Sequence, residues 1–79
     1  MRVGYFQFDP VFGEVARNLD HVSARLEQVE ADLIVLPELF ATGYQFVSQE
    51  EVSRLAEPVP DGATTKRLVE IAARRGMTI

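Results

Sequence analysis

Apolar and polar positions along this chain predict strands and helices in alternation. Residues 2–8 are aromatic and β-branched, which indicates a strand that Asp9-Pro10 ends. Across residues 14–30 an apolar side chain recurs every three or four positions, which predicts a helix with one apolar stripe. The short apolar run Leu33–Leu36 predicts a second strand, buried on both faces and ended by Pro37, which has no N–H to donate. This order predicts a parallel βαβ unit.

The second half of the chain predicts two further helices and the start of a third strand. In Ser48–Glu51, serine stands three residues before glutamate, which is the capping-box pattern and predicts the start of a short helix. The residues of this helix expected to face inward are Val52, Leu55 and Ala56. Residues 61–75 predict a longer helix, with Gly76 in the C-cap position. Residues 77–79 begin a third strand. The predicted fold class is therefore α/β, in the order β-α-β-α-α-β.

The length of the chain limits how much of the predicted sheet the predicted helices can cover. A chain of 79 residues makes at most one small domain. A strand buried on both faces needs a layer on each side, yet the predicted helices can barely cover one. We therefore expect residues 1–79 to be the N-terminal part of a larger single domain, incomplete as given. The alternative is that a partner chain supplies the missing layers.

Composition excludes several classes of function. The net charge of -4, without a basic cluster, argues against a nucleic-acid partner. The chain has no cysteine, so these residues hold no disulfide, thiolate metal site or cysteine nucleophile. No apolar run resembles a signal peptide or a transmembrane helix, so we expect no membrane association and a cytoplasmic location.

Glu38 is the residue that most suggests chemistry. It follows the carboxyl end of the predicted strand Leu33–Leu36, which is where ligands bind in open α/β sheets. A carboxylate held against so much apolar surface is unfavourable unless it is paired, hydrogen-bonded or partly protonated. On this pattern Glu38 is either a general base or an acceptor of backbone hydrogen bonds in a tight turn. Asp9 also follows a strand, and the two carboxylates could together hold Mg²⁺, although aspartate before proline is typical of a turn.

Polar and aromatic side chains follow Glu38 within ten residues, among them Phe40, Tyr44 and Ser48. Phe40 and Tyr44 follow Glu38 closely, so they either line a substrate pocket or pack their loop onto the sheet. Ser48 is interpreted as a helix cap rather than a nucleophile, because no histidine is placed to activate it.

One longer motif resembles a known family. The string Asp-Leu-Ile-Val-Leu-Pro-Glu-Leu-Phe-Ala-Thr-Gly-Tyr at 32–44 resembles the first catalytic motif of the nitrilase superfamily, the carbon-nitrogen hydrolases. The flanking segments that share the resemblance are Val3–Pro10, Asn18-Leu19, Pro60–Gly62 and Arg75–Met77. The resemblance implies a four-layer α-β-β-α sandwich, a homodimer or larger oligomer, and neither a metal nor an organic cofactor.

The resemblance also implies a mechanism. The family uses a Glu-Lys-Cys triad, in which cysteine attacks the carbonyl or nitrile carbon, glutamate is the general base and lysine stabilises the developing negative charge. Only the glutamate has a counterpart here, Glu38. Lys66 lies in the wrong context for the family's lysine motif, so lysine and cysteine are expected beyond residue 79, and the 79 residues alone are expected to be inactive. An amide or carbamoyl amide is favoured as substrate over a nitrile.

Two other functions remain open on the sequence. One is a non-catalytic fragment or interaction module that pairs through its sheet edge with another chain. The other is a Mg²⁺-dependent phosphate-binding α/β module that uses Asp9 and Glu38.

Overall fold

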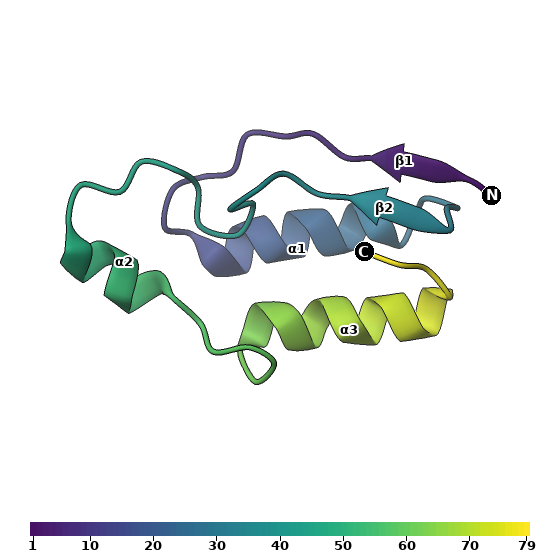
Figure 1. Cartoon of the computed structure of the whole chain (residues 1–79). Coiled ribbons are helices and arrows are strands. Elements are labelled where there is room, and N and C mark those ends of the chain that lie inside the picture. The colour runs from purple at the N-terminus through teal and green to yellow at the C-terminus, as the bar shows by residue number, and fades with distance from the viewer.

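The computed structural model describes all 79 residues and places two strands and three helices in the order β-α-β-α-α (Figure 1). The elements are β1 (Val3–Tyr5), α1 (Val15–Leu26), β2 (Leu33–Val35), α2 (Gln49–Leu55) and α3 (Ala63–Arg75). The two strands pair in parallel, with Val3 opposite Leu33 and Tyr5 opposite Val35. The parallel βαβ unit predicted from the hydrophobic pattern is confirmed.

Both strands are shorter than the sequence pattern indicated. The last bond between them runs from the backbone N–H of Phe6 to the carbonyl of Val35, at 3.0 Å. Beyond it the partner strand continues as Leu36 and Pro37, and proline has no N–H with which to extend a ladder. The predicted strand at residues 2–8 therefore pairs only over Val3–Tyr5, and its remaining residues continue as loop.

The predicted third strand is present only as a single bridge. Thr78 pairs in parallel with Leu33. Its backbone N–H donates to Asp32 O and its carbonyl accepts from Ile34 N–H, each at 2.8 Å. The position of the third strand was predicted correctly, but one bridge does not make a strand. β2 thus lies between β1 and residue 78.

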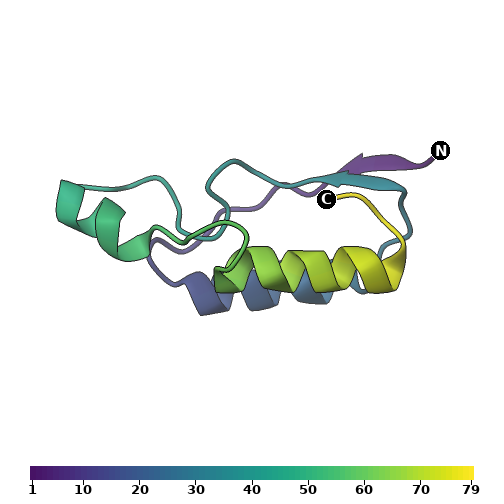
Figure 2. The ribbon, with the colours of Figure 1, turned by 60° about the horizontal axis from the view of Figure 1, so that its bottom comes forward.

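The core lies between the sheet and the pair of helices α1 and α3. Five buried apolar residues form it: Val22, Leu26, Ile34, Ile71 and Met77. They come from both helices, from β2 and from the segment after α3, so each element contributes one apolar face. Figure 2 shows both helices on the same side of the strands.

The opposite face of the sheet is open. Val3, Tyr5 and Val35 are 62%, 77% and 54% exposed, whereas the neighbouring Ile34 is only 5% exposed. No element of the chain lies over that face (Figure 2). Within residues 1–79 the run Leu33–Leu36 is covered on one face, because both core helices lie on the same side, and burial of its other face stays a prediction for the larger domain.

Helices α1 and α3 are also joined by polar contacts. The guanidinium of Arg67 lies 3.2 Å from both the Asp20 carboxylate and the Ser23 hydroxyl. Nearer the other end, Arg74 forms an ion pair with Glu27. Exposed pairs of this kind each add only about 0.2–1 kcal/mol, so the apolar contacts contribute most of the stability of the helix pair.

The short helix α2 begins as predicted but packs differently. The Ser48 hydroxyl accepts from the Glu51 N–H at 3.2 Å, and the Glu51 carboxylate accepts from the Val47 N–H at 3.1 Å. These are the contacts of a capping box, shifted by one residue on the glutamate side. The prediction that α2 has an inward face (Val52, Leu55 and Ala56) is wrong here. None of its residues is buried, because the helix lies beside the core rather than on it (Figure 1).

The predicted C-cap of α3 provides a first testable prediction. Gly76 adopts the left-handed conformation, with φ 64° and ψ 39°, and a Cβ added there would meet nothing within 4 Å. Gly76→Ala should therefore lower the free energy of unfolding by about 1–2 kcal/mol through backbone strain alone. Urea denaturation of the full-length protein measures the change. Gly76→Asn is the matched control and should lose less, since asparagine tolerates this conformation better. An alanine variant as stable as the parent would contradict the cap.

Candidate active site

The candidate site is the turn that follows β2. Pro37 ends strand pairing, and Leu39 then adopts a left-handed conformation with φ 54°. The Gly43 N–H donates to the Leu39 carbonyl at 2.8 Å and closes the turn. Glu38 lies within it, at the edge of the sheet where the carboxyl ends of both parallel strands meet. This is the position that the sequence predicted for its carboxylate.

The surroundings of Glu38 differ from the prediction. The residue is exposed. The expectation of a carboxylate held against apolar surface is therefore wrong for these residues, because no element covers that side of the turn. An exposed carboxylate is stable without a buried partner and can be reached by other groups.

The side chain of Tyr44, from the loop after this turn, contacts the turn. Its hydroxyl donates a hydrogen bond to the backbone carbonyl of Glu38. The ring, 54% exposed, borders a cavity of about 220 Å³. The cavity is lined by Asp9, Pro10, Phe12, Gly43, Tyr44 and Gln45. The structure thus brings the loop after β1 and the loop after Glu38 together around one hollow that offers an aromatic face, a carboxylate and an amide.

Phe40 lies differently from Tyr44. It is half-buried and packs against the apolar core. This contact corresponds to the packing alternative for Phe40, whereas Tyr44 borders open space. Asp9 is exposed and borders the cavity, and Glu38 is not among the residues that line it.

Asn18 is a residue of this region whose role the sequence analysis missed. It lies on α1, is only 2% exposed, and bonds the loops after both strands. A signal was available, because Asn18 falls three residues after Val15, within the apolar stripe of the helix. A polar side chain on an inward face requires hydrogen-bond partners.

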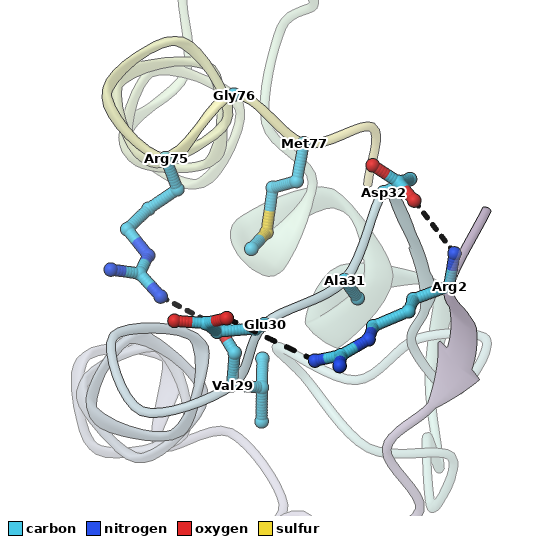
Figure 3. A pocket seen from close by; sticks show the side chains of 8 residues that line it. All are labelled: Arg2, Val29, Glu30, Ala31, Asp32, Arg75, Gly76 and Met77. Atoms are coloured by element: carbon cyan, nitrogen blue, oxygen red, sulfur yellow. Dashed lines mark hydrogen bonds and ion pairs between the residues drawn. The ribbon is translucent and has the colours of Figure 1, made fainter.

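A second cavity, of about 330 Å³, lies at the amino ends of the strands, away from Glu38 (Figure 3). Its charged side chains contact neighbouring backbone and side chains, although the buried Nε of Arg75 has no hydrogen-bond partner. Arg75 donates to the Val29 carbonyl at 2.6 Å, and Arg2 lies 3.9 Å from the Glu30 carboxylate. The Arg2 backbone N–H also donates to Asp32 at 2.6 Å. These contacts join the segment that leads into β2 to the start of β1 on one side and to the end of α3 on the other.

The structure contains no group of three or more His, Cys, Asp or Glu side chains arranged to hold a metal ion. None of its helices has the length and apolar character that crossing a membrane requires.

Comparison with known proteins shows where this chain is similar to others. Residues 2–79 match the carbon-nitrogen hydrolase family. The chain is 37% identical over 82 residues to a protein named nitrilase from Pyrococcus abyssi, a match that covers 100% of this chain and 31% of that protein. It is 40% identical over 80 residues to a protein of Pseudomonas protegens named hydrolase in pqqF 5′ region, covering 100% of this chain and 27% of that protein. The chain thus spans less than a third of the length of either relative.

Proposed function

Because this chain belongs to the carbon-nitrogen hydrolase family, we propose that the full-length protein hydrolyses a non-peptide C–N bond in a small molecule. The proposed substrate is an amide or a carbamoyl amide, and a nitrile is the less favoured class. One observation carries the proposal: Glu38 lies exposed in a hydrogen-bonded turn at the carboxyl end of β2. A carboxylate at that edge is open to substrate and to side chains from later segments.

In the proposed mechanism Glu38 is the general base of a Glu-Lys-Cys triad whose lysine and cysteine lie beyond residue 79. Glu38 accepts the thiol proton while sulfur bonds to the amide carbon, and the proton then leaves with the nitrogen as ammonia or an amine. Water next attacks the thioester, again giving a proton to Glu38, and the carboxylic acid and the free thiol are released. The lysine ammonium stabilises the negative charge on oxygen in both steps.

The proposed architecture is the four-layer α-β-β-α sandwich, with residues 1–79 as the N-terminal part of a single domain. This architecture is supported by the fact that only one face of the sheet is covered by helices. Helices α1 and α3 cover one face, whereas Val3, Tyr5 and Val35 leave an apolar surface on the other. A second sheet would bury that surface. Assembly as a homodimer or larger oligomer and a cytoplasmic location remain predictions.

Tyr44 is proposed to contact substrate. Its ring borders the cavity of about 220 Å³, and its hydroxyl reaches the backbone of Glu38, so a ligand in the cavity would lie beside the turn that carries the base. Phe40 also remains a predicted substrate contact, although its described contacts are with the core.

A substrate screen combined with thiol alkylation tests the proposed function. The full-length protein is incubated with simple amides, carbamoyl amines and nitriles, and released ammonia is measured. We expect release from an amide or a carbamoyl amine, no loss of activity with EDTA, and loss after treatment with N-ethylmaleimide, because the proposed nucleophile is a thiolate. Substrate present during alkylation should protect the enzyme. Full activity after complete alkylation, or no ammonia from any of the three classes, would contradict the proposal.

A further inference from the structure

The buried side chain of Asn18 connects the two loops at the carboxyl end of the sheet. Asn18 is 2% exposed and lies in the second turn of α1, where asparagine has low helix propensity. Its Oδ1 accepts from the Val11 N–H at 2.8 Å. Its Nδ2 donates to the Val11 carbonyl at 2.9 Å and to the Ala41 carbonyl at 2.8 Å. Both amide hydrogens are thus used, and Asn18 joins α1 to the segment that follows Glu38.

Other contacts also hold the segment after Glu38: the Tyr44 hydroxyl donates to the Glu38 carbonyl, and Phe40 packs on the apolar core. The Thr42 carbonyl accepts from the Gly13 N–H at 2.8 Å, and Gly43 packs so closely on Phe12 that an added Cβ would lie 3.2 Å from its Cα. Together with the bond from Asn18 to Ala41, these contacts dock the turn on the loop after β1. Among these hydrogen bonds, the one from Asn18 to Ala41 is the one that comes from a helix.

We propose that Asn18 is a positioning residue for Glu38: its side-chain amide holds the Ala41 carbonyl and thereby places the Glu38 turn relative to α1. The inference rests on the proposed function, in which Glu38 is the general base. A base must lie within hydrogen-bond reach of the proton that it takes, and small misplacements lower rates strongly. Loss of the amide donor also leaves a buried carbonyl without its partner, which favours movement of the turn.

Steady-state kinetics of Asn18→Ala in the full-length protein test the inference. We expect kcat to fall about 10–100-fold while KM changes much less, because substrate contacts remain and the position of the base is altered. Asn18→Asp keeps the side-chain size and the acceptor for the Val11 N–H but loses the Nδ2 donor to both the Val11 and the Ala41 carbonyls. It should show the same kcat loss, and it replaces the alanine variant if that variant does not fold.

Ser23→Ala is the matched control. Ser23 is a second buried polar residue of α1, 9% exposed, but it contacts Arg67 on α3 rather than the Glu38 turn. This variant should keep the parental kcat even if it loses stability. An equal loss of kcat in Ser23→Ala and Asn18→Ala would indicate a general effect on the helix and overturn the positioning role.

A double variant separates this inference from the proposed function. In the Glu38→Gln background, Asn18→Ala should lower the residual kcat very little, because the base that it positions is already gone. If Glu38→Gln keeps most of the activity, the proposed function fails. If Glu38→Gln lowers kcat as expected but leaves a measurable residue, and Asn18→Ala either keeps its kcat or lowers kcat equally in both backgrounds, only the role of Asn18 fails.

Discussion

Glu38→Gln is expected to lower kcat of the full-length protein about 10²–10⁴-fold, the usual contribution of a general base. Glutamine keeps the size and the hydrogen-bonding oxygen of the side chain but cannot accept the thiol proton. Because Glu38 is exposed in the turn after β2 and the structure shows no buried partner for it, the substitution should leave the fold intact. The measurement is ammonia release under saturating substrate, together with a thermal unfolding curve.

Two further variants make the Glu38 result specific. Glu70→Gln removes the same charge from an exposed position of α3 that forms no ion pair, and it should keep the parental kcat. Glu38→Asp keeps a carboxylate but withdraws it by one methylene, so its activity should lie between that of the parent and that of the glutamine variant. A glutamine variant that retains most of its kcat would show that Glu38 is only a turn residue.

Ile71→Ala is expected to lower the free energy of unfolding by about 2–5 kcal/mol, the usual range when a buried isoleucine is truncated. Ile71 is 1% exposed on α3 and packs into the cluster that contains Val22, Leu26 and Ile34. It therefore contributes to the contact of α3 with α1 and the sheet. Its loss leaves a cavity where three elements meet, and close-packed interiors collapse only partly around such a cavity.

The same helix supplies the controls for Ile71. Val69 is 60% exposed, so Val69→Ala should change the free energy of unfolding by no more than about 0.5 kcal/mol. Ile71→Val removes one methylene and should cost about 0.5–1.5 kcal/mol. Chemical denaturation of the full-length proteins gives all three values. If Ile71→Ala and Val69→Ala cost the same, Ile71 does not belong to the core that the structure describes.

Features that depend on one or a few adjacent residues were predictable from the sequence. Pro37 ends strand pairing, because it lacks an N–H. Gly76 caps α3 in the left-handed conformation, and Ser48 caps α2 through the Glu51 N–H. The apolar stripe of α1 likewise predicted the burial of Leu19, Val22 and Leu26. In each case the chemistry of the residue and its immediate neighbours is enough to determine the local backbone.

The candidate site was predictable only in part. The sequence located Glu38 at the end of β2 and placed Tyr44 near it, and the resemblance of residues 32–44 to the family motif agrees with the family match over 2–79. It did not predict that Glu38 is exposed or that Asn18 bonds the turn. Asn18 and Ala41 are 23 residues apart, and their contact depends on the angle at which α1 packs on the sheet.

Long-range packing accounts for the remaining differences. A run such as Leu33–Leu36 indicates that a strand is apolar, but the number of layers around it depends on where the other elements lie. Here α1 and α3 pack side by side on one face, so Ile34 is buried and Val35 is 54% exposed. Local backbone chemistry therefore accounts for the helix caps at Ser48 and Gly76 and for the end of strand pairing at Pro37. The tertiary arrangement sets which face is covered and which side chains meet around Glu38, because those contacts join residues that are distant in the chain.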